Sequence, residues 1–152
     1  MAREKTLVLI KPGAIQRELA GEIITRFERK GIKIVGVKMM MLDDYIIEKH
    51  YSHLRGEPFF NELKKGMQRT PIIALALEGN GVIKRVRTLI GATNPIEALP
   101  GTIRGDYSIS LSNNVIHASA NAEEALIELQ RFFDEDEIFN YQRMNVMDYA
   151  ED

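Results

Sequence analysis

Apolar residues in this chain alternate between short runs and stripes at helical spacing, and this alternation limits the possible folds more than any other feature. The runs predict strands at residues 6–10, 32–41 and 71–77, with a fourth strand inside 107–117. The stripes predict helices at residues 19–30, 43–53, 58–68, 82–90 and 122–133. The order is therefore strand, helix, strand, two short helices, strand, helix, long loop, strand and helix.

This order is a split β-α-β pattern, which predicts an α+β fold of the ferredoxin-like class. We expect a four-stranded antiparallel sheet with helices covering one face, because the elements form two small linked β-α-β units. A doubly wound parallel sheet is the less favoured alternative. The 152 residues contain no repeat and fit a single domain spanning residues 1–152.

Two segments lie outside this regular pattern. Residues 91–106 are rich in Gly, Pro, Thr and Asn, and a loop of that length in a compact domain is usually functional. The acidic tail, residues 134–152, carries scattered apolar residues. We expect the tail to pack over the surface or against another subunit, with disorder at its last few residues.

Composition excludes several classes of protein. The net charge of −2 and the sequence pI of about 6.0 argue against a protein that coats nucleic acid or an anionic membrane. The absence of cysteine excludes disulfides, thiol catalysis and thiolate metal sites. The first apolar run is too short for a signal peptide or a membrane span, so we expect a cytoplasmic protein.

A histidine near a strand end is the strongest functional signal. His117 ends an apolar run and follows the glycine-punctuated segment that contains Arg104. Neutral imidazole is nucleophilic, and a nearby arginine suggests an anionic substrate, most simply a phosphate. Asn121 is predicted to cap the next helix, with Glu124 as its capping-box partner, which places His117 at a strand-to-helix turn. On that helix Glu128 is placed to accept the imidazole N–H, although a solvated glutamate is the commoner outcome.

Several segments together resemble the nucleoside diphosphate kinase family over nearly the whole chain. The signature is Asn-Val-Ile-His-Ala-Ser at residues 114–119. Supporting motifs are Lys-Pro at 11–12, His-Tyr at 50–51, Pro-Phe-Phe at 58–60, Thr-Asn-Pro at 93–95 and Pro-Gly-Thr-Ile-Arg-Gly-Asp at 100–106. The resemblance implies a ping-pong exchange with broad base specificity. His117 would take the γ-phosphate of a nucleoside triphosphate as phosphohistidine and pass it to a nucleoside diphosphate.

The resemblance also implies roles for the surrounding side chains. Lys11 would contact the sugar hydroxyls and the terminal phosphates, and Tyr51 would lie near His117 and Lys11. Ser119 and Glu128 would support and orient the imidazole. The nucleotide-binding residues would be Arg87, Thr93 and Arg104 for the phosphates, Asn114 for the sugar, and Phe59, Leu63 and Leu111 for the base.

The same resemblance implies the ligands and the assembly. Mg²⁺ would enter on the nucleotide phosphates rather than on protein side chains, and the partners would be nucleoside di- and triphosphates, not a membrane or a nucleic acid. We expect a homo-oligomer, which in this family is a dimer, a tetramer or a hexamer. His50 and His53 lie three apart on a predicted helix, but no third metal ligand is evident, so we interpret them as ordinary surface or packing residues.

Two other functions remain as alternatives. The first is a regulatory module that binds nucleotides in the same pocket without turnover. The second is a nucleic-acid-binding protein, which the predicted strands disfavour because they lack the aromatic and basic pattern of RNA-binding sheets.

Overall fold

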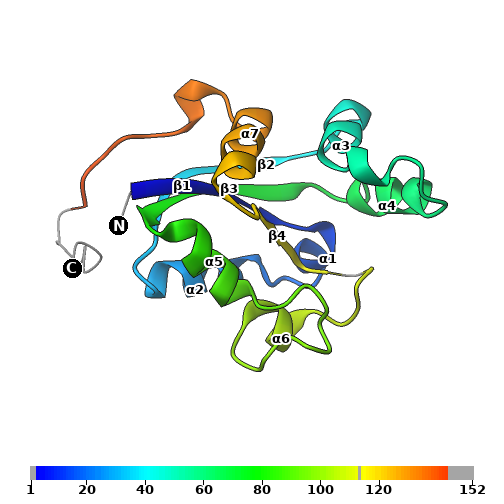
Figure 1. The fold of residues 1–152 in the computed structure, drawn as a ribbon, viewed down its shortest axis with the longest axis horizontal. Coiled ribbons are helices and arrows are strands. Elements are labelled where there is room, and N and C mark those ends of the chain that lie inside the picture. The colour runs from blue at the N-terminus through cyan, green and yellow to red at the C-terminus, as the bar shows by residue number, and fades with distance from the viewer. Residues whose placement is uncertain (1–2, 113, 144–152) are drawn as a thin grey trace.

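A four-stranded antiparallel sheet lies at the centre of the computed structural model, which describes residues 3–112 and 114–143 (Figure 1). The strands are β1 (Arg3–Ile10), β2 (Lys33–Met40), β3 (Ile72–Asn80) and β4 (Ile116–Ala118). They lie in the order β2-β3-β1-β4, so that β1 and β3 are central and β2 and β4 form the edges. The predicted ferredoxin-like α+β class is confirmed.

Helices cover both faces of the sheet, so the expectation of one covered face was wrong (Figure 1). One face packs against α2 (Ala20–Arg29) and α5 (Val82–Ile90), and the other against α3 (Asp44–His50), α4 (Phe60–Met67) and α7 (Ala122–Phe132). Side chains of β1 alternate between the two cores: Leu7 and Leu9 enter one, and Val8 and Ile10 enter the other. Because this part of β1 is buried on both faces, the sequence from Leu7 to Ile10 is a continuous apolar run.

Two five-residue helices were not predicted from the sequence. Helix α1 (Pro12–Gln16) follows β1 directly, and α6 (Ile103–Tyr107) lies within the long loop. The side-chain oxygen of Thr102 caps α6 by accepting the backbone N–H of Gly105 at 3.0 Å. Helices this short contain little more than one turn, so they leave no periodic stripe in the sequence.

Other boundaries moved by a few residues. The predicted helix at 43–53 divides into α3 and the 3-10 turn η1 (Ser52–Leu54), and β4 has three residues, two of which lie in the predicted 107–117 segment. The N-cap residue of α7 is Asn121, as predicted, since its Oδ1 accepts the backbone N–H of Glu124 at 2.9 Å. Gly31, which ends α2, has the left-handed φ of 77° that a C-terminal glycine supplies.

The tail packs over the sheet edge, as expected, up to the end of the described residues. After the 3-10 turn η2 (Glu135–Glu137), the backbone N–H of Phe139 donates to the carbonyl of Val35 in β2 at 2.8 Å. Lys33 donates to the carbonyl of Tyr141, and its Nζ lies 4.3 Å from the centre of that ring. The disorder expected at the last residues falls on 144–152, outside the described residues. Among the helices that are described, none has the length and apolar character needed to span a membrane.

Candidate active site

His117 is the middle residue of the edge strand β4, and its register partner is Leu9 of β1. Because side chains alternate along a strand, His117 lies on the sheet face covered by α7, while Ile116 and Ala118 enter the opposite core. Its side chain is 23% exposed. The imidazole is therefore held by the fold and still accessible to a ligand.

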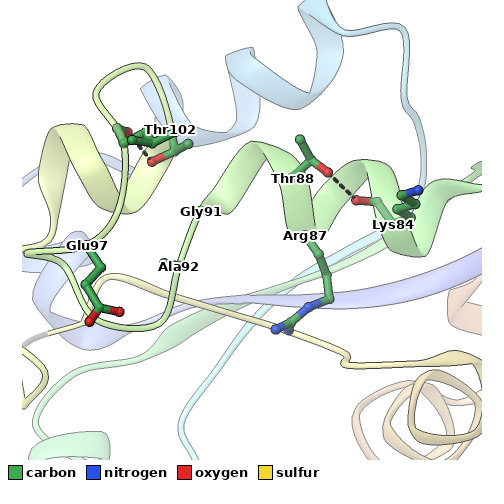
Figure 2. Close-up of a pocket in the computed structure, with 8 residues that line it drawn as sticks. Lys84, Arg87, Thr88, Gly91, Ala92, Glu97 and Thr102 are labelled. Carbon is green, nitrogen blue, oxygen red and sulfur yellow. Dashed lines mark hydrogen bonds between the residues drawn. The ribbon is translucent and has the colours of Figure 1, made fainter.

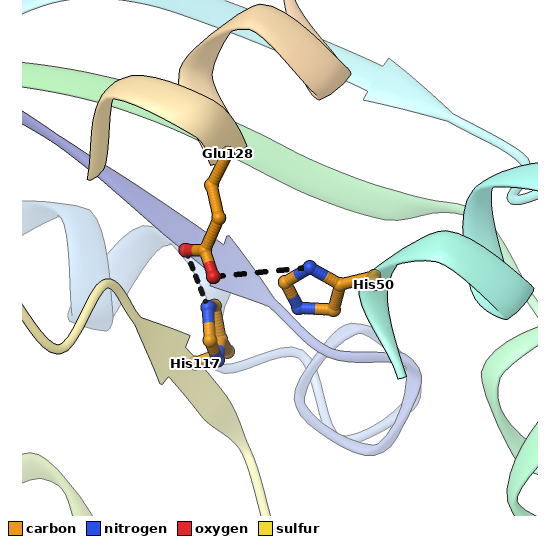
Figure 3. Close-up of side chains that lie close together, drawn as sticks. All are labelled: His50, His117 and Glu128. Atoms are coloured by element: carbon orange, nitrogen blue, oxygen red, sulfur yellow. Dashed lines mark hydrogen bonds and ion pairs between the residues drawn. The ribbon is translucent and has the colours of Figure 1, made fainter. Parts of the chain in front are cut away.

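A buried carboxylate holds one edge of this imidazole (Figure 3). Glu128 on α7 places Oε1 2.9 Å from Nε2 of His117, and the hydroxyl of Ser119 donates to the same oxygen at 2.7 Å. Burial opposes ionisation of Glu128, but the hydrogen bonds from His117 and Ser119 outweigh it, so the pKa of Glu128 is lowered. Since a carboxylate only accepts, Nε2 carries a ring proton, and Nδ1 is the nitrogen that holds the lone pair when the ring is neutral.

His50 contributes a contact that the sequence reasoning missed. It ends α3, it is buried, and its ring meets the His117 ring edge to face with centroids 4.6 Å apart. His53 is exposed. A signal for His50 was present in the sequence, because it lies three residues after Ile47 and so shares the buried face of that helix.

One side-chain cluster in the described part of the chain has the composition of a metal site. The ligand atoms of His50, His117 and Glu128 lie within 4.8 Å of one another. Arg131 places Nη1 2.9 Å from Nδ1 of His50, so a guanidinium already occupies that nitrogen. A fixed cation beside the ligands disfavours a metal ion, and Mg²⁺ prefers oxygen ligands. This cluster does not fit a resident magnesium.

Two arginines line the outer edge of β4 on either side of His117. Arg104 is buried and donates through Nη2 to the carbonyl of Ile116 at 3.1 Å. Arg87 extends from α5 and donates to the carbonyl of Ala118 at 3.3 Å. These carbonyls belong to the residues immediately before and after His117, so both guanidinium groups lie close to its backbone.

Lys11 adds a third cation at the end of β1. Its backbone N–H donates to the carbonyl of Val115 at 3.0 Å, which ties it to the segment leading into β4. Burial, and then the charge of Arg104, lowers the pKa of Lys11 to about 8. Burial and the charge of Arg87 lower the pKa of Arg104 to about 10.

These cations are not neutralised by the protein. In the ranges 3–112 and 114–143, the side chains of Lys11, Arg87 and Arg104 form no ion pair with a carboxylate. Three like charges held together without a counter-ion are a typical anion-binding arrangement.

The loop after α5 supplies further candidate residues and one wall of a pocket. Thr93 is exposed, and Asn114 is buried with its Oδ1 accepting from Nε of Arg104 at 3.2 Å. Figure 2 shows the pocket between α5 and this loop, with Arg87 pointing from α5 toward β4. The pocket measures about 500 Å³ and is lined by Lys84, Arg87, Thr88, Gly91, Ala92, Glu97, Leu99 and Thr102.

The remaining predicted residues lie on the α3–α4 side and in the loop before β4. Tyr51 is buried against His50, with ring centroids 4.8 Å apart, and its hydroxyl faces the sulfur of Met67 at 3.8 Å. Burial, and then the charge of Glu128, raises the pKa of Tyr51 above its usual range. Phe59 at the start of α4 is 50% exposed, and Leu111 before β4 is 62% exposed. Leu63 is half-buried against the core.

The sequence model of one family, described as nucleoside diphosphate kinase, matches residues 4–138. The chain belongs to the nucleoside diphosphate kinase family. Relatives called nucleoside diphosphate kinase include one from Parabacteroides distasonis, 52% identical over 98% of each chain. Another from Archaeoglobus fulgidus is 47% identical over 92% of this chain and 93% of the relative.

Solved structures of nucleoside diphosphate kinases have the same fold. The enzyme from Halobacterium salinarum, in complex with CDP, superimposes with a TM-score of 0.90 at 41% identity, over 94% of this chain and 95% of that one. A transition-state mimic of the Borrelia burgdorferi enzyme, with bound vanadate and ADP, has a TM-score of 0.86 at 39% identity, over 93% and 94% of the two chains.

Proposed function

We propose that this chain is a nucleoside diphosphate kinase that transfers the γ-phosphate of a nucleoside triphosphate to a nucleoside diphosphate through a phosphohistidine on His117. One observation carries the proposal: an imidazole, fixed by Glu128 through Nε2, lies on a strand whose edge holds unneutralised cations. Phosphoryl transfer needs an in-line nucleophile and fixed positive charge, and little else from the protein.

The transfer divides into two equivalent halves. Nδ1 of His117 attacks the γ-phosphorus, the bond to the β–γ bridging oxygen breaks, and the nucleoside diphosphate leaves. In the second half an acceptor diphosphate attacks the phosphohistidine, and the N–P bond breaks. Positive charge grows on the imidazole as the N–P bond forms, and the Glu128 carboxylate stabilises it through the Nε2–H bond of 2.9 Å.

The nucleotide would lie between the cations and the exposed aromatic side chain of α4. Lys11, Arg87 and Arg104 hold the phosphates, with Thr93 as a further donor, and Asn114 binds the sugar. Phe59 stacks on the base, with Leu63 and Leu111 beside it. The half-exposed ring of Phe59 supports this role, and stacking is tolerant of base identity, which gives broad specificity.

Magnesium would be held mainly by the nucleotide. The carboxylate beside His117 is already committed to two hydrogen-bond donors, and the other groups near β4 are cations. A phosphate-bound Mg²⁺ supplies charge neutralisation on the phosphate oxygens. Lys11, Arg87 and Arg104 would hold the complex through those same phosphates.

The enzyme would be a cytoplasmic homo-oligomer that associates through the edge of β2. The tail bonds to this strand at Val35 through the backbone of Phe139 and at Lys38 through the side chain of Glu137. Between and beyond these contacts Val37, Met39 and Met41 are 56%, 59% and 53% exposed. An apolar edge strand is a template for pairing with a second copy, and pairing would cover these side chains. The absence of cysteine is compatible with the reducing cytoplasm.

The decisive experiment is to mix the protein with Mg²⁺ and γ-labelled ATP in the absence of acceptor. We expect label on the protein that is acid-labile and alkali-stable, that is released by added GDP, and that is lost in His117→Gln. Tight nucleotide binding without label would instead favour the regulatory module, and label that persists in His117→Gln would place the nucleophile elsewhere.

A further inference from the structure

Two side chains of helix α7, one helical turn apart, each contact a histidine ring on another element. Glu128 contacts His117, and Arg131, three residues later, contacts His50 through Nη1 and Nδ1 at 2.9 Å. Residues three apart lie on one face of a helix, so both side chains reach down from α7 toward the sheet. The first of these contacts belongs to the proposed reaction, whereas the second has no assigned purpose.

The contact with Arg131 determines which nitrogen of His50 carries the ring proton. A guanidinium can only donate, so Nδ1 of His50 must be the acceptor and the ring proton must lie on Nε2. Burial, and then the charges of His117, Arg131 and Lys11, lower the pKa of His50 to about 3, and the charge of Glu128 opposes this shift. His50 is therefore a neutral ring in a single tautomer.

The ring of His50 is also fixed in space. It meets Tyr51 and Phe132 edge to face, at centroid distances of 4.8 and 5.3 Å. It meets His117 in the same way at 4.6 Å, with an angle of 83° between the planes. Glu128 contacts His117 through one nitrogen only, and a single hydrogen bond does not stop the ring from rotating about it. Contacts with neighbouring side chains must therefore limit this rotation. His50 supplies that packing.

We propose that Arg131 is a positioning residue for phosphoryl transfer. It holds the ring of His50 against His117, so that the attacking nitrogen of His117 keeps a fixed orientation. The inference rests on the proposed function of His117. An in-line reaction loses rate steeply when the nucleophile is misdirected, and a displacement of about 1 Å can cost about a hundredfold. Nucleotide binding does not depend on the direction of the imidazole.

The test compares Arg131→Met with Gln130→Met, a matched change at an exposed neighbouring position of α7. We expect Arg131→Met to lower kcat and the single-turnover rate of phosphohistidine formation by roughly tenfold, with the nucleotide KM within about twofold of wild type. Gln130→Met should match wild type in both. A purely structural role would instead lower thermal stability and leave kcat unchanged in the folded fraction, and that result would overturn the proposal.

A second measurement reads the tautomer directly. Imidazole ¹⁵N spectra should show His50 protonated only on Nε2 in wild type and as a mixture of tautomers in Arg131→Met. A single tautomer in both proteins would overturn the proposal. This readout needs no turnover, so it remains decisive if wild type forms no labelled intermediate, which is the outcome that would defeat the proposed function.

A double-mutant cycle tests whether Arg131 acts through His50. His50→Phe keeps a ring in place and removes the acceptor, so Arg131→Met should cost no further kcat in that background. Losses that multiply in the double variant would show that Arg131 acts independently of His50 and would overturn the mechanism.

Discussion

Replacing Glu128 by glutamine removes one charge from the site and leaves its shape. In the structure one carboxylate oxygen accepts from His117 at 2.9 Å and from Ser119 at 2.7 Å, and the side chain is 9% exposed. A hydrogen bond to a charged group is worth about 1 to 1.5 kcal/mol more than a neutral one. With two bonds affected, and the one to His117 strengthening as the imidazole becomes positive, we expect a loss of about 2 kcal/mol of transition-state stabilisation. That corresponds to about a thirtyfold fall in kcat.

The assay is single-turnover formation of phosphohistidine together with steady-state kcat and nucleotide KM. The loss should appear in kcat, because Glu128 contacts the nucleophile and not the nucleotide. Glu123→Gln, in the exposed first turn of the same helix, removes an equal charge away from the site and should leave kcat unchanged. A Glu128→Gln enzyme with kcat within twofold of wild type would refute the argument that this carboxylate stabilises the charged imidazole.

Three further predictions concern pH, capping and packing. Because the pKa of Lys11 is lowered to about 8, nucleotide affinity should fall as the pH rises from 7 to 9, below the pKa of about 10 for Arg104, whereas Lys11→Arg should show no such fall; calorimetric titration decides this. Asn121→Ala removes the cap of α7 and should cost about 1 kcal/mol, or about 2–4 °C in Tm, and an unchanged melting curve would contradict it. In Gly105→Ala the new Cβ would lie 2.0 Å from the carbonyl oxygen of Leu99, so we expect a loss of about 3 kcal/mol on chemical denaturation, while Gly66→Ala, with no atom within 4 Å, should be neutral or stabilising.

The sequence predicted the long elements because their periodic patterns are strong. The strand at residues 6–10 and the helix cap at Asn121 each depend on local chemistry, and both were found. Local chemistry does not determine which face of the sheet a helix covers. That choice depends on connections between distant segments, and the helices proved to cover both faces.

For a similar reason, only some of the residues of the site were predicted from the sequence. The sequence identified His117 and Glu128 as candidates, and the structure places them in contact, although their catalytic roles still await experiment. It did not identify the pair of His50 and Arg131. These residues are 81 positions apart in the chain and belong to different helices, so no spacing within one element could have revealed the contact.

Arg104 joins three separate parts of the chain with one guanidinium. Besides the carbonyl of Ile116, it binds the carbonyl of Gly91 at 3.1 Å and the side chain of Asn114 at 3.2 Å, which connects the end of α5, the long loop and β4. The order of the loop and the placement of Arg104, the proposed phosphate ligand, are therefore lost together in one cooperative step. A protease that cuts this loop should abolish nucleotide affinity at the first cleavage, and bound nucleotide should protect the loop from that cut.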